Sequence, residues 1–154
     1  LVVQTFSKSR SMAGMRIGYA FGDEKLIRYL NDVKYSFNSY TMNRPAIAAG
    51  TAAVEDETYF RETVQKIIAT RERTKEGLRE LGFVFGDSKA NFIFAAHPGC
   101  DARELFEAMK KEKIYVRYFD KPRIDNYLRI SIGTDEEMDR LLEFLRGYLK
   151  AVKE

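Results

Sequence analysis

A lysine flanked by hydroxyl side chains is the feature of this sequence with the clearest chemical potential. Lys8 stands between Ser7 and Ser9, directly after a short apolar stretch, and Arg16 follows eight residues later between two glycines. A lysine amine that condenses with a carbonyl must be unprotonated, and burial or nearby cations favour that form. Lys8 is therefore a candidate for covalent chemistry with an aldehyde.

The residues around Lys8 could also hold an anion. Thr5 and Ser7 or Ser9 offer hydroxyl donors, and Arg16 offers a forked guanidinium that matches phosphate geometry. The glycines on either side of Arg16 let the backbone approach a ligand closely. This segment suits a cofactor that carries both an aldehyde and a phosphate, although a lysine on its own is most often a solvated surface residue.

Two further arginines lie in apolar, strand-like segments near the end of the chain. Arg129 interrupts the stretch 127–132, and an arginine in such a strand needs a partner. Arg117 ends the stretch 114–117, where a plain surface role is the alternative. A structural salt bridge is the alternative for Arg129, and an ion pair within a strand is the alternative for Arg16.

The elements that must position these residues are strands and helices in a mixed order. Asp23 and Pro45 are placed to begin helices, Gly82 is placed to end one, and Thr134 with Glu137 forms a capping-box pattern. Hydrophobic periodicity predicts strands at 1–6, 83–85, 91–95, 114–117 and 127–132. It predicts helices from Asp23 to about 35, from Pro45 to about Val54, at 57–81, from Asp101 to about Lys111, and from Thr134 to the end, with Phe60, Val64, Ile67, Ile68, Leu78 and Leu81 on one face of the long helix.

The order of these elements predicts an α/β fold with two parts. The segment 1–56 carries the lysine, and the boundary falls at the start of the long helix. The segment 57–154 reads as strand, strand, helix, strand, strand, helix after that helix, which predicts a small α/β sandwich with helices on one sheet face. Because Leu1 opens the chain inside a predicted strand, without a methionine, we expect a piece of a longer protein. Its uncovered strand edges and apolar faces predict self-association.

Composition excludes several classes of function. The 26 basic residues are dispersed and the net charge is only +3, which argues against a nucleic-acid arm or a membrane-surface helix. No apolar run is long enough to cross a bilayer, and no signal peptide is visible. No metal-ligand spacing is visible around His97 or Cys100, and the lone cysteine is consistent with a reducing cytoplasm.

The segment from Thr5 to Gly18 resembles the lysine signature of the class I/II, fold-type I aminotransferases, in which a hydroxyl-rich turn and a lysine precede Gly-x-Arg-x-Gly. The resemblance implies that Lys8 forms the Schiff base with pyridoxal 5'-phosphate (PLP). It also implies that Ser7 and Arg16 bind the cofactor phosphate, with help from Thr5.

The stretches 114–119 and 127–134 look like the C-terminal part of the same family, and most resemble its histidinol-phosphate aminotransferases. By that resemblance, Arg129 binds the anionic end of the substrate and Arg117 helps to hold the substrate phosphate. Asn91, in Lys89-Ala90-Asn91-Phe92-Ile93, matches a position near the substrate pocket.

What the resemblance implies for the whole is a cytoplasmic homodimer that transaminates histidinol phosphate with 2-oxoglutarate and glutamate in histidine biosynthesis. The residues 1–56 would be a C-terminal remnant of the large cofactor-binding domain, and 57–154 the small C-terminal domain. Counterparts of the family's first half, including the carboxylate and the aromatic ring that hold the cofactor ring, are missing upstream of Lys8. Two alternatives stay open: a catalytically silent structural or dimerising module, and an aminotransferase or decarboxylase of another amino acid or amino-phosphate.

Overall fold

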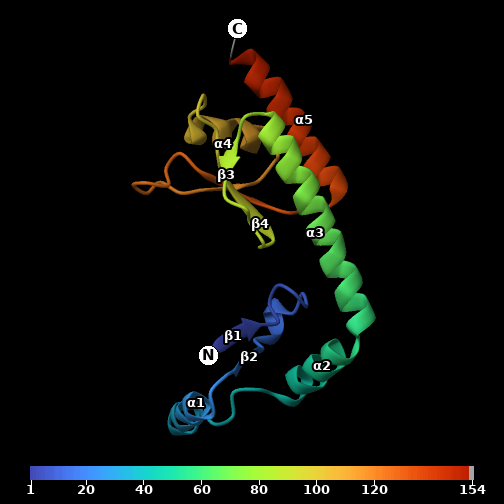
Figure 1. Cartoon of the computed structure of the whole chain (residues 1–154), viewed down its shortest axis with the longest axis vertical. Helices are drawn as coiled ribbons and strands as arrows, with labels where there is room; N and C mark the ends of the chain where they lie inside the picture. Colours follow the sequence, from blue (N-terminus) through green and yellow to red (C-terminus); the bar gives the residue numbers. More distant parts are fainter. Residues whose placement is uncertain (153–154) are drawn as a thin grey trace. The chain divides into compact units, whose positions relative to one another are not determined.

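The computed structural model describes residues 1–152, which form a mixed α/β structure in two compact units (Figure 1). The first unit is Leu1–Val64 and the second begins at Gln65. The predicted boundary coincides with the first residue of helix α3 (Glu57–Glu80), whereas the two units separate inside that helix.

A two-stranded hairpin forms the part of the first unit that carries the lysine. Strand β1 (Val2–Thr5) pairs antiparallel with β2 (Gly18–Phe21), and Thr5 lies opposite Gly18. The long connection between the strands contains a short 3-10 helix, η1 (Ala13–Met15). The strand predicted at the N-terminus is therefore confirmed, and the candidate lysine stands in the loop that the hairpin closes.

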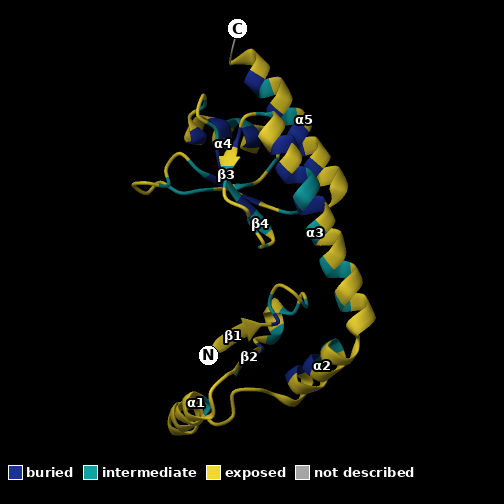
Figure 2. Ribbon diagram, viewed as in Figure 1, coloured by how far each residue is buried: buried dark blue, intermediate teal, exposed yellow. Residues whose placement is uncertain are grey.

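Two capped helices follow the hairpin. Helix α1 (Glu24–Phe37) begins after Asp23, whose side chain accepts a hydrogen bond of 2.9 Å from the backbone N–H of Lys25. Helix α2 (Arg44–Glu55) has proline in its first turn, as predicted. Helix α1 continues to Phe37, two residues beyond the end predicted near residue 35. All of α1 lacks buried side chains (Figure 2), so its apolar face is uncovered within this unit.

The second unit is built on a four-stranded antiparallel sheet with the order β3-β4-β6-β5. The central strands are β4 (Phe92–Ala96) and β6 (Leu128–Ser131), and the outer strands are β3 (Val84–Phe85) and β5 (Arg117–Tyr118). Residues 114–116, predicted to be strand, lie outside β5. The alternation of buried and exposed side chains along β4 and β6 gives the sheet one buried face.

Helices cover that buried face. Helices α4 (Ala102–Lys111) and α5 (Asp135–Ala151) share a single hydrophobic cluster with the inward side chains of β4 and β6. Helix α3 reaches the same cluster with Leu78, which is fully buried. Among its other core members are Phe83, Ile93, Ala95, Leu105, Met109, Leu128, Ile130, Met138, Leu141, Leu142, Leu145 and Leu149.

The buried face of helix α3 is less apolar than its sequence predicts. Its buried residues are mainly polar: Thr70, Arg71, Thr74 and Lys75 are buried beside Gly77 and Leu78, whereas Ile67 is exposed. The polar groups are tolerated because they have partners, since Lys75 bonds to the carboxylates of Glu72 and Asp87. Hydrophobic periodicity could not show this, because it assigns polar side chains to the surface.

Candidate active site

The loop that carries Lys8 is held by its own hydrogen bonds. The backbone N–H of Ser7 donates to the hydroxyl oxygen of Thr5 at 2.8 Å, and the N–H of Ser11 donates to the carbonyl of Lys8 at 3.0 Å. At the base of the loop, the buried Phe6 accepts from the N–H of Met12 at 3.1 Å. The loop is thus closed at its foot while the Lys8 side chain remains exposed.

The candidate phosphate ligands meet at the end of the hairpin. The N–H of Phe6 donates to the carbonyl of Ile17 at 3.1 Å, so Ser7 and Arg16 flank the same bonded pair. The backbone of Arg16 is left-handed, with φ 56°, a conformation that costs a residue other than glycine roughly 1 kcal/mol or more. Within residues 1–152 the guanidinium of Arg16 makes no ion pair, and it donates to the carbonyl of Ala13 at 3.1 Å.

These residues fit a phosphate. Thr5 and Ser7 offer hydroxyls and Arg16 offers a charged fork, all from one end of one hairpin. Phosphate oxygens accept hydrogen bonds from such donors, and the charge on arginine strengthens them. An amine on the same loop, at Lys8, is what an aldehyde beside that phosphate would meet.

In the second unit, two arginines stand directly opposite each other on neighbouring strands. Arg117 of β5 pairs with Arg129 of β6, and like charges in that position repel. Their guanidinium carbons lie 5.4 Å and 5.9 Å from the ring centroid of Phe119. Neither arginine forms an ion pair with a residue in the part of the chain that the structure describes. The pair therefore has capacity for an anion.

An aromatic cluster adjoins the arginine pair on the face of the sheet away from the helices. Phe94 stacks on Tyr127 with centroids 4.6 Å apart, and meets Phe119 edge-on at 6.0 Å. Phe94 also lies opposite Arg129 in the sheet register. An open groove of about 640 Å³ runs along this cluster, lined by Phe92, Phe94 and Tyr127 among others. This face could receive an apolar or aromatic group together with an anion.

Asn91 directly precedes β4. Its carbonyl accepts a hydrogen bond of 3.0 Å from the N–H of Ile132, which extends the ladder between β4 and β6. The loop before it is tied to α3, because the guanidinium of Arg71 donates to the carbonyl of Ala90 at 3.2 Å. The ammonium of Lys75, and to a lesser extent that of Lys89, holds the pKa of Asp87 down at about 2.

The structure thus assembles two groups of predicted site residues. Lys8 and its three candidate phosphate ligands belong to the first unit, whereas Asn91, Arg117 and Arg129 belong to the second. Sequence reasoning missed the aromatic residues Phe94, Phe119 and Tyr127. Phe119 and Tyr127 each lie two positions from one of the arginines in the sequence, whereas only the sheet register brings Phe94 opposite Arg129. It also missed Arg10, two residues after Lys8.

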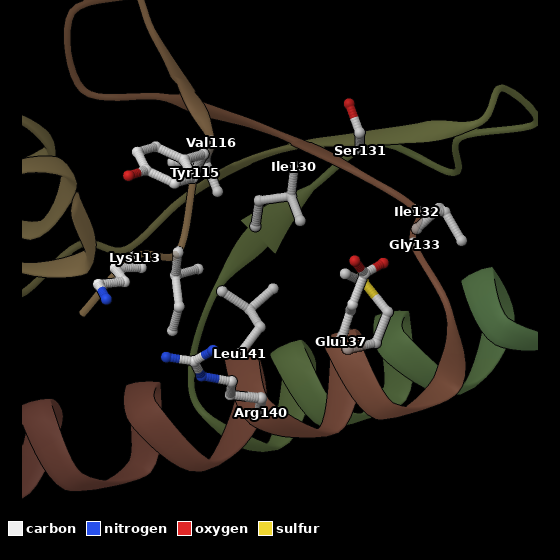
Figure 3. A pocket seen from close by; sticks show the side chains of 12 residues that line it. Lys113, Tyr115, Val116, Ile130, Ser131, Ile132, Gly133, Glu137, Arg140 and Leu141 are labelled. Carbon is white, nitrogen blue, oxygen red and sulfur yellow. The ribbon is translucent and has the colours of Figure 1, made fainter.

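A separate hollow of about 310 Å³ lies between residues 113–116, the end of β6 and the first turns of α5 (Figure 3). Its apolar wall includes Ile114, Ile130 and Leu141. The carboxylate of Glu137 accepts from the N–H of Thr134 at 2.9 Å, and Arg140 donates to the carbonyl of Glu112 at 2.6 Å. No predicted site residue lines this hollow, and these two charged groups are occupied by structural bonds.

No helix among the residues described is long and apolar enough to cross a membrane.

Comparison with known proteins identifies the family of the chain. Residues 1–145 match the family model described as aminotransferase class I and II. The chain belongs to this family. It is 55% identical over 150 residues to a histidinol-phosphate aminotransferase of Brachyspira hyodysenteriae, covering 97% of this chain and 42% of that protein. It is 54% identical over 154 residues to that of Lactococcus lactis subsp. lactis, covering 100% and 43%.

Solved structures show the same fold. The histidinol-phosphate aminotransferase of Sinorhizobium meliloti, determined in complex with pyridoxal-5'-phosphate, matches with a TM-score of 0.79 and 27% identity, covering 97% of this chain and 41% of that one. That of Clostridium acetobutylicum has a TM-score of 0.85 at 24% identity, covering 97% and 45%. The chain therefore spans less than half the length of the relatives that it matches.

Proposed function

We propose that this chain takes part in the PLP-dependent transamination of histidinol phosphate with 2-oxoglutarate and glutamate, a step of histidine biosynthesis. The observation that carries the proposal is the hairpin end that presents Lys8 beside two hydroxyls and Arg16. Residues 1–56 would belong to the large cofactor-binding domain, and 57–154 would form the small C-terminal domain. The likeness to histidinol-phosphate aminotransferases over the whole chain supports both statements.

Lys8 would bind the cofactor aldehyde and then move the proton. When bound, PLP supplies an aldehyde that condenses with amines and a ring that spreads the negative charge left when the substrate C–H bond breaks. The Nζ of Lys8 would take the proton from the substrate carbon as a general base and deliver it to the cofactor carbon as a general acid. Thr5, Ser7 and Arg16 would hold the phosphate, which fixes the cofactor relative to Lys8.

The arginine pair would orient the substrate. Arg129, opposite Arg117 and without an acidic partner in the described residues, would bind the phosphate of histidinol phosphate or the carboxylate of glutamate. The stacked rings of Phe94 and Tyr127 offer an apolar surface for the imidazole side. Asn91 would contribute from its position directly before β4.

We further propose that the active protein is a cytoplasmic homodimer. Helix α1 supports an interface, because its apolar residues have no cover in the first unit: Phe37 is 91% exposed and Val33 is 66% exposed. Contiguous exposed apolar surface of this kind marks contact sites. Light scattering tests this, since a stable monomer would contradict it.

The lysine assignment is tested by trapping. The chain is incubated with PLP, reduced with borohydride and mapped by mass spectrometry. We expect reduction to concentrate at Lys8, to fall when inorganic phosphate competes, and to disappear in Lys8→Ala. Lys25→Ala is the matched control, since Lys25 is an exposed helix lysine in the same unit. Label spread evenly over the surface lysines would overturn the proposal.

The substrate assignment is tested separately, because a related aminotransferase or decarboxylase would share Lys8. The enzyme that contains this chain is assayed with histidinol phosphate and with aromatic amino acids. Replacing Arg117 by glutamine should weaken use of histidinol phosphate more than use of the amino acids, because only the former carries a phosphate at that end. Equal effects on both substrates would point to another amino acid or amino-phosphate.

A further inference from the structure

Arg10, two residues after Lys8, is bound on three sides. Its guanidinium carbon lies 4.2 Å from the ring centroid of Phe60 in α3 and 5.6 Å from that of Phe6 at the foot of the lysine loop. Its Nη1 also donates to the carbonyl of Ala53 in the last turn of α2. All of these groups belong to the first unit.

Each of these contacts suits arginine specifically. A planar guanidinium can stack on a ring while its edge donates hydrogen bonds, which the point charge of a lysine cannot do. The carbonyls of the last helical turn lack partners inside the helix, and they form the negative end of its dipole. The Ala52 carbonyl accepts a hydrogen bond from the N–H of Asp56, and the next carbonyl, that of Ala53, accepts one from Arg10.

The contacts of Arg10 complete the closure of the lysine loop. Phe6 anchors one limb of that loop, because it is buried and accepts from the N–H of Met12. Arg10 lies in the other limb and touches the same ring. Lys8 thus lies between Phe6 and Arg10, which contact each other. Arg10 in turn contacts the last turn of α2 and the first turn of α3.

We propose that Arg10 is a positioning residue that fixes the Lys8 loop against the junction of α2 and α3. The inference rests on the proposed function for its role in catalysis, since Arg10 acts through Lys8. In this role Arg10 acts together with Phe60, because the guanidinium stacks on that ring. Displacement of a reacting group by about 1 Å can reduce the rate ~100-fold. A looser loop that displaces Lys8 should therefore slow the reaction strongly.

The first test measures the loop itself and needs no cofactor. Amide hydrogen exchange is followed for residues 7–12 in the full chain and in Arg10→Lys, which keeps the charge but loses the fork. We expect exchange in this segment to accelerate ~10-fold or more, while the β1–β2 ladder exchanges as before. Arg28→Lys is the matched control, because Arg28 is an exposed arginine of the same unit that makes one helical ion pair with Glu24.

The second test measures the lysine. Selective trapping of PLP at Lys8 should fall ~10-fold in Arg10→Ala relative to surface lysines, and added guanidinium at low millimolar concentration should restore part of it. Phe60→Leu should move both readouts in the same direction, and Phe60→Tyr should behave as the unaltered chain, since its ring still stacks.

The outcomes separate the two proposals. Unchanged hydrogen exchange at 7–12 in Arg10→Lys would overturn the positioning role, whatever the trapping shows. Faster exchange together with unselective trapping in the unaltered chain would support the positioning of the loop and overturn the assignment of Lys8. Loss of the β1–β2 protection as well in Arg10→Lys would show a general role in folding and would also contradict the proposal.

Discussion

The contact between α3 and α5 gives a sharp prediction at Gly77. A Cβ built on Gly77 would lie 2.7 Å from Cδ1 and 3.0 Å from Cδ2 of Leu142, which is buried in the core of the second unit. Carbon atoms in contact prefer about 3.5–4.0 Å, so Gly77→Ala forces the leucine or a helix to move. Gly147 in α5 is the opposite case, since its Cβ would meet nothing within 4 Å.

The two substitutions should have opposite signs. Replacing glycine by alanine inside a helix is worth about 1 kcal/mol in favour of folding, and Gly147→Ala should gain that amount. Overpacking a core costs about 1–3 kcal/mol, so Gly77→Ala should lose up to ~2 kcal/mol after the same helical gain. The difference between the two variants is the steric cost, and it corresponds to about 4–8 °C in melting temperature for each kcal/mol in a domain of this size.

The assay is urea or thermal unfolding followed by far-ultraviolet circular dichroism on both variants in parallel. The double variant Gly77→Ala with Leu142→Ala tests the cause, since removing the leucine methyls should make the added Cβ harmless or favourable. If Gly77→Ala stabilised the protein as much as Gly147→Ala does, the close packing of α3 on α5 at this point would be refuted.

Two further predictions concern charge and one concerns a helix cap. The pKa of Asp87 lies at about 2 because Lys75 and Lys89 favour its charged form. Its contribution to folding stability is therefore fully present above the ordinary pKa near 3.8 and is lost as the pH falls through 2. Asp87→Asn should flatten that part of an acid titration followed by circular dichroism, and an unaltered titration would contradict the ion pair. Arg117→Gln should raise stability by ~0.2–1 kcal/mol at low salt, because it removes the repulsion opposite Arg129, and the gain should vanish in 1 M salt; a loss of stability instead would mean that the two charges do not repel. Thr134→Ala should cost ~1 kcal/mol, because it removes one half of the capping box with Glu137, and Thr134→Ser should restore most of it; an alanine variant as stable as the parent in urea would exclude the cap.

Local features were predictable from the sequence where neighbouring residues alone decide them. The Thr134 and Glu137 capping box, the cap at Asp23 and the end of α3 at Gly82 are confirmed, and Gly82 has the left-handed φ of 85° expected of a helix stop. Each depends on a backbone conformation within three or four residues. The family itself was also evident, because the spacing of Lys8 and Arg16 is a local pattern.

Features that depend on a distant partner were not predictable. Residues 114–116 have a strand-like pattern, but β5 begins only at Arg117. A strand requires a hydrogen-bonded neighbour, and residues 114–116 diverge from β6 beside the hollow of Figure 3. The same holds for Lys75, whose burial depends on Asp87 in the loop between β3 and β4. Hydrophobic patterning describes one element at a time and contains no information about what lies across from it.

The sequence by itself therefore determined the types and order of the chemical groups: the lysine among hydroxyls, the arginines in apolar strands and the helices that follow. Only the tertiary structure decided which of them meet. It set Arg117 opposite Arg129 beside Phe119, and it set Arg10 between two rings that are 54 positions apart in the chain. Such meetings follow from strand register and from packing between elements, and both are fixed by long-range contacts.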